Sequence, residues 1–108
     1  MIRQMHVEEV AERVAANEPV YFLDVRRPDE NEYCRLPESV LVPLQELPDR
    51  LDEVTPPEGA LVVVYCHHGV RSLSGASILQ QAGFTNVVSM AGGIEAWSQR
   101  IDRRIPRY

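Results

Sequence analysis

The chain has 108 residues, of which 44% are hydrophobic and 6% aromatic, and a formal net charge of −5 at pH 7. This length predicts one domain, residues 1–108, whose core needs no disulfide or metal. The negative charge argues against nucleic acid as a partner, because phosphate binding depends on clustered Lys and Arg. No apolar stretch approaches the about 18 residues of a membrane span, and no leader pattern is present. We therefore expect a cytoplasmic protein that does not bind a membrane.

The predicted elements alternate between strands and helices. In chain order they are a strand at 2–5, a helix at 6–17, a strand at 20–25, a charged turn at 26–30, a strand at 39–42, two short helices between 44 and 54, a strand at 61–65, a helix at 72–82, a strand at 86–89, a helix at 94–100 and a basic, solvated segment at 100–107. This alternation predicts a single α/β domain with a mostly parallel, about five-stranded sheet and helices on both faces. Ligands then belong at the carboxyl ends of the strands.

Cys66 lies at such an end, directly after the apolar run from Leu61 to Tyr65. It precedes a turn with Gly69 that opens the next helix. Unpaired N–H groups and the helix dipole stabilise negative charge at a helix N-terminus, and Arg71 adds a permanent cation. A cysteine after a valine run is more commonly an inert core residue, but this turn favours a reactive thiolate.

The residues that follow Cys66 are expected to line a substrate site. His67, His68, Gly69 and Val70 would offer ring or backbone N–H groups to an anionic substrate, and Arg71 would hold an oxyanion. Neighbouring histidines cannot supply the four ligands of a structural zinc site, so we expect no metal, and no other cofactor.

Other residues are expected to support the site. Asp24 and Arg26 end a neighbouring strand and are predicted to form a structural pair with Glu30, while Ser72 lies behind the loop. The only other cysteine, Cys34, lies in a polar stretch without a strand-to-helix turn. We expect it to be a free thiol with no part in the reaction.

Three segments together resemble the rhodanese family of sulfurtransferases. They are residues 23–44, similar to the family's first signature, residues 65–72, similar to its active-site loop, and residues 91–97, similar to its Gly-Gly-Trp ending. The sequence departs from the family at Arg35, where histidine is usual, and at Glu38, where glycine is usual. If that position takes a positive φ, Glu38 costs about 1 kcal/mol or forces a different turn. Gly92 and Gly93 are expected to form a tight turn, and Trp97 to lie in the core.

The resemblance implies that Cys66 carries sulfur. Its thiolate would attack the outer sulfur of thiosulfate, release sulfite and form a persulfide, from which cyanide or a thiol removes the sulfur. A cysteine phosphatase or arsenate reductase uses similar chemistry, but those families place five residues between Cys and Arg, and only four lie between Cys66 and Arg71. A sulfur-relay or binding module of the same fold, with an acceptor protein as partner, stays open.

Overall fold

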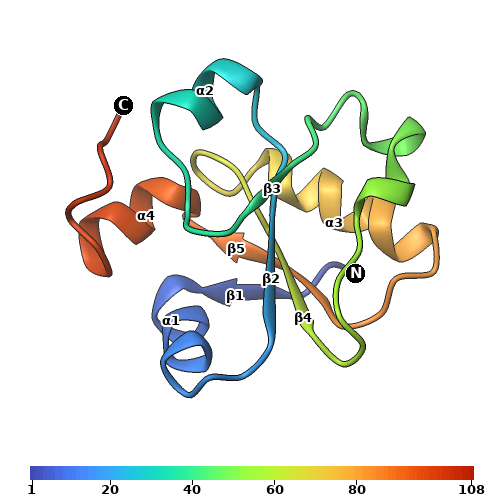
Figure 1. The fold of residues 1–108 in the computed structure, drawn as a ribbon, viewed down its shortest axis with the longest axis horizontal. Coiled ribbons are helices and arrows are strands. Elements are labelled where there is room, and N and C mark those ends of the chain that lie inside the picture. Colours follow the sequence, from blue (N-terminus) through green and yellow to red (C-terminus); the bar gives the residue numbers. More distant parts are fainter.

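In a computed structural model, which describes residues 1–108, the chain forms a five-stranded parallel sheet in the order β1-β5-β4-β2-β3 (Figure 1). The strands are β1 (Gln4–His6), β2 (Val20–Asp24), β3 (Val40–Leu41), β4 (Leu61–Tyr65) and β5 (Val87–Ala91). The helices are α1 (Val7–Ala15), α2 (Pro28–Tyr33), α3 (Arg71–Gln81) and α4 (Gly93–Arg100), with short 3-10 helices at Leu47–Asp49 and Leu51–Glu53. The α/β prediction is therefore confirmed.

Strand β4 lies at the centre of the sheet, and all five of its residues are buried. Its side chains alternate between two cores. Leu61, Val63 and Tyr65 pack with residues of α1 and α4, whereas Val62 and Val64 pack with residues of α3 on the other face. Because every strand runs in the same direction, all carboxyl ends share one edge of the sheet. Cys66 follows β4 at the middle of that edge.

The segment predicted as a charged turn at 26–30 instead leads into helix α2. Pro28 occupies the first turn, where its fixed φ suits a helix and its missing N–H has no partner to lose. The Glu30 carboxylate accepts a hydrogen bond from the Arg27 backbone N–H at 3.0 Å. The prediction missed this helix because six residues are too few for a hydrophobic period to show.

The basic segment predicted to be solvated, residues 100–107, does expose its arginines, but the chain from 101 to 108 is also held against α4, which the prediction missed. Ser98 donates a hydrogen bond to the backbone oxygen of Ile105, and Arg107 pairs with Glu95 at 2.6 Å. These contacts bring Tyr108 back to the carboxyl edge of the sheet. The segment therefore packs against α4 and reaches the neighbourhood of α2.

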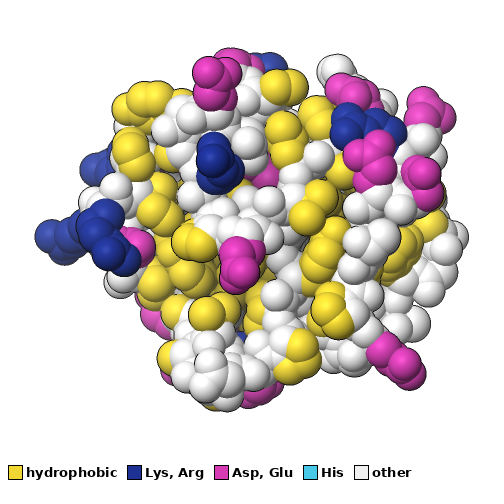
Figure 2. All heavy atoms as spheres, in the orientation of Figure 1, with side chains coloured by type: hydrophobic (Ala, Val, Ile, Leu, Met, Phe, Trp, Pro, Cys, Tyr) yellow, Lys and Arg dark blue, Asp and Glu magenta, His cyan; other side chains and the backbone are white.

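The face shown in Figure 2 carries no extended basic area, because its arginine side chains lie in small separate groups among acidic and apolar ones, and the chain has no lysine. None of the helices combines the length and the apolar character needed to cross a bilayer.

Candidate active site

The Cys66 sulfur lies in a pocket made by backbone amides at the start of α3. The Gly69 N–H donates to Cys66 Sγ at 3.2 Å, and the Ser72 N–H donates at 3.3 Å. The Cys66 side chain is 1% exposed. Two convergent N–H donors at a helix N-terminus stabilise negative charge on that sulfur.

Ser72 lies closer to the sulfur than expected. Besides its amide, its hydroxyl oxygen is 3.5 Å from Cys66 Sγ. The same hydroxyl is 2.7 Å from that of Ser89, which comes from β5. Both serines are fully buried, so this hydroxyl pair is shielded from water and fixes the floor of the pocket.

Residues 66–71 form the loop that leads from β4 into α3, called here the Cys66 loop. The turn between β5 and α4 binds the backbone carbonyls of this loop. The Ile94 N–H donates to the Cys66 carbonyl at 2.9 Å, and the Glu95 N–H donates to the His67 carbonyl at 3.1 Å. Gly93 has φ +62°, and a Cβ there would collide with both of these carbonyl oxygens. The Gly-Gly turn therefore lets the N-terminus of α4 bind the Cys66 loop directly.

Gly69 is required by two independent constraints. Its φ is +100°, a region that side chains disfavour. A Cβ at this position would also lie 2.9 Å from the Gly92 nitrogen. Since its N–H is one of the two donors to Cys66, any substitution at Gly69 would move the sulfur pocket.

Arg71 does not point freely into a substrate site. Its Nη1 and Nη2 donate to the two carboxylate oxygens of Glu30 at 2.7 and 2.9 Å. The Glu30 side chain is 4% exposed, and hydrogen bonding to Arg71 holds the pKa of Glu30 well below its usual range. The same bonds raise the pKa of Arg71. The predicted pairing of Glu30 with Arg26 was wrong: Glu30 forms ion pairs with Arg71 at 2.7 Å and with Arg27 at 3.8 Å.

Asp24 and Arg26 form the predicted pair, fully buried beside Glu30. Arg26 donates through Nε and Nη2 to the two Asp24 oxygens at 2.9 and 2.7 Å. Burial alone would lower the pKa of Arg26. Hydrogen bonds to Asp24 and Tyr108 outweigh that effect, so the pKa of Arg26 is raised overall. Burial, together with the Asp24 charge, raises the pKa of Tyr65 to about 12. Neither Asp24 nor Arg26 contacts the Cys66 sulfur, so both support the loop from behind.

The two histidine rings stack on each other, with His67 half-buried and His68 exposed. The His67 ring lies 3.8 Å from the Tyr108 ring with an interplanar angle of 6°, and 3.9 Å from the His68 ring. Burial and the neighbouring His68 lower the pKa of His67. Val70, by contrast, is 74% exposed at the tip of the loop.

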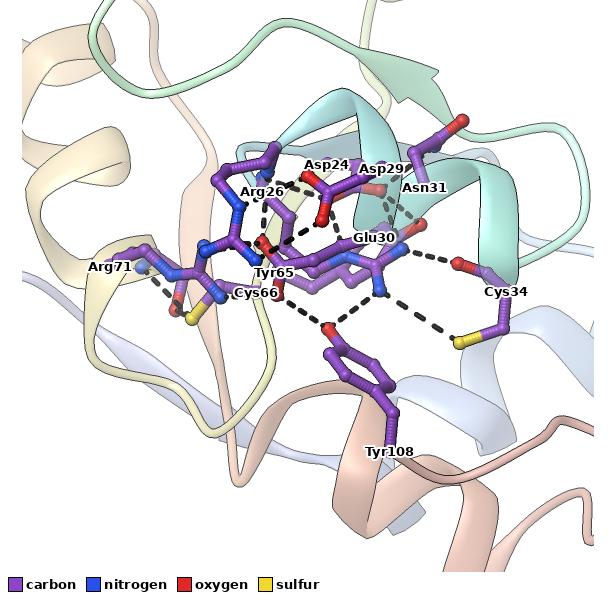
Figure 3. Close-up of polar contacts among 12 residues, drawn as sticks. Asp24, Arg26, Asp29, Glu30, Asn31, Cys34, Tyr65, Cys66, Arg71 and Tyr108 are labelled. Carbon is purple, nitrogen blue, oxygen red and sulfur yellow. Dashed lines mark hydrogen bonds and ion pairs between the residues drawn. The ribbon is translucent and has the colours of Figure 1, made fainter.

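Cys34 lies in a buried position rather than in the polar surroundings expected. It is 6% exposed, and its Sγ is 3.9 Å from Arg26 Nη1 (Figure 3). Its backbone oxygen accepts from Arg26 Nη2 at 2.6 Å. No backbone N–H donates to its sulfur.

Sequence reasoning missed three contributors to the site: Ser89, the role of Glu30 as partner of Arg71, and Tyr108. Tyr108 is 78 residues from Glu30, and its hydroxyl lies 2.8 Å from Glu30 Oε2. No local pattern identifies such a contact.

A cleft of about 220 Å³ opens beside Arg27 and Arg71. A larger cleft, of about 790 Å³, has no residue of the Cys66 loop in its lining.

Together these features define an α/β domain that presents a buried cysteine to backbone amides at the end of its central strand. The chain belongs to the rhodanese-like family: the model of the rhodanese-like domain matches residues 6–100. This is a family of sulfurtransferases, as the resemblance of the three segments implied.

Three relatives show the extent of the similarity. A sulfurtransferase of Allochromatium vinosum is 32% identical over 99 residues, covering 92% of this chain and 91% of its own. The adenylyltransferase and sulfurtransferase uba4 of Ogataea parapolymorpha is 31% identical, over 90% of this chain and 25% of its own. The crystal structure of a thiosulfate sulfurtransferase from Pseudomonas aeruginosa superposes with a TM-score of 0.79 and 31% identity, over 91% of this chain and 19% of its own.

Proposed function

We propose that this protein transfers sulfane sulfur through a persulfide on Cys66. The observation that carries the proposal is the pair of N–H donors, from Gly69 and Ser72, that converge on Cys66 Sγ after the central strand. A persulfide is anionic at its outer sulfur, and amide dipoles at a helix N-terminus stabilise such a charge without reorganisation.

The reaction has two steps. The Cys66 thiolate attacks the outer sulfur of thiosulfate, a bond forms between the two sulfurs, and sulfite leaves with the electron pair of the broken S–S bond. A thiolate or cyanide acceptor then attacks the outer sulfur of the persulfide, and Cys66 leaves as a thiolate. Cys66 alternates between two covalent forms, so donor and acceptor react in turn. No separate general base is needed once the thiolate is formed.

Thiosulfate as donor is supported by the charge beside the loop. The cleft of about 220 Å³ is lined by Arg27 and Arg71, and a thiosulfate sulfonate needs cationic hydrogen-bond donors. Because Glu30 holds both terminal nitrogens of Arg71, the sulfonate would have to share or displace these bonds. The thiosulfate sulfurtransferase from Pseudomonas aeruginosa is similar over most of this chain.

Intact mass after incubation with thiosulfate tests the proposal directly. The protein should gain the mass of one sulfur atom and lose it again when cyanide or a thiol is added. Cys66→Ser should gain nothing, and Cys34→Ser, which leaves the other free thiol in place, should behave like the unchanged protein. If no sulfur is retained, the proposal is wrong.

A cysteine phosphatase is the alternative with related chemistry. It requires a loop wide enough to enclose three phosphoryl oxygens, and four residues between Cys66 and Arg71 leave less room than the five of those enzymes. We expect no Cys66-dependent hydrolysis of an aryl phosphate. Turnover of that substrate exceeding sulfur transfer at equal concentration would reverse the assignment.

The physiological acceptor can also be a protein. The Ogataea relative carries its matching region within a chain about four times longer, named as an adenylyltransferase and sulfurtransferase. We propose sulfur delivery to a protein acceptor as a second use of the Cys66 persulfide. A cytoplasmic setting, where thiols stay reduced, suits two cysteines that are both free.

A further inference from the structure

Tyr108 inserts its hydroxyl between two charged residues that lie behind the Cys66 loop. It accepts a hydrogen bond from Arg26 Nη1 at 2.9 Å and donates one to Glu30 Oε2 at 2.8 Å. Figure 3 shows the side chain rising from the segment after α4 with its hydroxyl directed at both residues. One phenol therefore links the buried Asp24–Arg26 pair to the Glu30–Arg71 pair.

The Tyr108 ring makes a second, separate contact with the Cys66 loop. It stacks on the His67 ring at 3.8 Å with the planes within 6° of parallel. It also meets the Tyr33 ring of α2 edge to face, with the ring centroids 6.0 Å apart. The ring thus joins α2, the segment 101–108 and the residue that follows Cys66.

Tyr108 donates a hydrogen bond to Glu30, the residue that orients Arg71. Glu30 Oε1 accepts from Arg71 Nη1 and the Arg27 amide, and Oε2 accepts from Arg71 Nη2 and Tyr108. Tyr108 is therefore one of three residues that fix this carboxylate. Arg71 in turn begins α3, and the next residue, Ser72, supplies an N–H donor to Cys66 Sγ.

We propose that Tyr108 is a positioning residue for sulfur transfer, acting on the Cys66 loop through Glu30 and Arg71 with its hydroxyl and through His67 with its ring. This proposal rests on the function proposed above. Tyr108 itself does not contact the sulfur. Its effect is to hold the Arg71 charge and the start of α3 where the reaction needs them.

The phenol suits this role because it stays protonated. Although Tyr108 is 42% exposed, partial burial of its hydroxyl and the hydrogen bond to Glu30 raise its pKa to about 12, so the hydroxyl remains a donor to Glu30 throughout the pH range of an assay. A phenylalanine would keep the stack on His67 but leave Arg26 Nη1 with only the Cys34 sulfur, at 3.9 Å. Glu30 Oε2 would lose one of its two donors.

Two substitutions separate the hydroxyl from the ring. Tyr108→Phe should lower kcat for sulfur transfer from thiosulfate to cyanide about tenfold, with KM changed less than about twofold, because one charge-assisted contact that orders the loop is lost. Tyr108→Leu, which also removes the stack, should lower kcat further. The rate of the first sulfur-loading event, followed by quenched mass measurement, should fall in parallel.

Two controls separate positioning from a loss of stability. Tyr33→Phe removes a phenol of the same aromatic cluster that makes no hydrogen bond, and kcat should stay unchanged. Val10→Ala removes two buried methyl groups from the core on α1, an element outside both the segment 101–108 and the Cys66 loop. It should lower Tm while kcat, measured well below unfolding, is retained.

The outcomes divide clearly. If wild-type Cys66 accepts no sulfur, the proposed function fails, and this inference fails with it. If the wild type transfers sulfur and Tyr108→Phe matches it in kcat, or if kcat follows Tm alike in the Tyr108 and Val10 variants, the positioning role is wrong. A higher rate in Tyr108→Leu would show that this side chain obstructs the site, which also overturns the proposal.

Discussion

The two cysteines of this chain are almost equally buried but lie in different chemical surroundings. Cys66 is 1% exposed and Cys34 is 6% exposed. The sulfur of Cys66 receives N–H donors from Gly69 and Ser72, whereas the nearest donor to Cys34 is the Arg26 guanidinium at 3.9 Å. Burial therefore does not distinguish the proposed nucleophile, Cys66, from the other free thiol, Cys34. The donors that surround the sulfur do.

The difference extends to how each sulfur is held. Backbone atoms fix Cys66, since the amides of Ile94 and Glu95 bind the carbonyls of residues 66 and 67. Side chains surround Cys34, and the central one, Arg26, is already committed to Asp24. A negative charge on the Cys66 sulfur would be stabilised by the Gly69 and Ser72 N–H dipoles, which already point toward it. A negative charge on the Cys34 sulfur would have to compete with Asp24 for the Arg26 guanidinium.

The largest expected effect comes from removing the Cys66 sulfur. Cys66→Ser should abolish sulfur transfer, with at least about a thousandfold loss, because a hydroxyl does not form the persulfide. Circular dichroism should show an unchanged fold, since the smaller atom fits the same pocket. Steady-state turnover measures the loss. Sulfur transfer by Cys66→Ser at the wild-type rate would show that another residue carries the sulfur.

Removing the guanidinium beside Cys34 should instead reduce stability. Arg26→Met leaves the Asp24 carboxylate buried without its counter-charge, and breaking such a pair costs about 3–5 kcal/mol. Urea denaturation measures the change. Arg50→Met is the matched control, because its ion pairs with Glu46 and Glu53 are partly exposed and surface ion pairs contribute little to stability. Equal losses in the two variants would contradict the importance of the buried pair.

Acid should weaken the network that supports Arg71. The pKa of Glu30 is lower in the folded chain than in the unfolded one, so its stabilisation is present above the unfolded value of about 4.3 and is lost as pH falls below it. One such group changes the free energy of unfolding by at most about 1.4 kcal/mol per pH unit. Glu30→Gln should be less stable than wild type at pH 7, and the difference should shrink by pH 3.

The exposed Glu58→Gln serves as the control for this pH series and should follow the wild-type curve. A difference between wild type and Glu30→Gln that stays constant from pH 7 to pH 3 would contradict the lowered pKa of Glu30.

The smallest effect should come from Cys34. Cys34→Ser should leave sulfur transfer within about twofold of wild type and change the free energy of unfolding by about 1 kcal/mol or less, since serine keeps the volume and a weak acceptor for Arg26. Turnover and thermal unfolding measure both quantities. A loss of turnover comparable to that of Cys66→Ser, in folded protein, would make Cys34 a second reacting thiol.

The parts of the fold and site that follow local patterns could be predicted from sequence. The valine run of β4, the glycine turn and the helix start put Cys66 at the right edge, and the positive φ considered for Glu38 is present at +61°. Trp97 lies in the core, and Gly93 packs tightly as expected.

The contacts that sequence could not provide join residues far apart in the chain. Which carboxylate neutralises Arg71 depends on how α2 and α3 pack, and nothing local to Glu30 distinguishes Arg26 from Arg71 as its partner. Tyr108 stands at the end of a basic stretch that has the composition of a solvated segment. Only the folding of that segment back across α4 reveals its contact with the site.

The donation of two amides to one sulfur atom also makes the reaction visible by magnetic resonance. Adding a sulfur to Cys66 changes the electron density in front of the Gly69 and Ser72 N–H groups, so their amide cross-peaks should shift most. Glycine amides fall in a sparse spectral region, and the chain has only six glycines. The Gly69 resonance can therefore serve as an internal gauge of sulfur occupancy in titrations with any donor or acceptor.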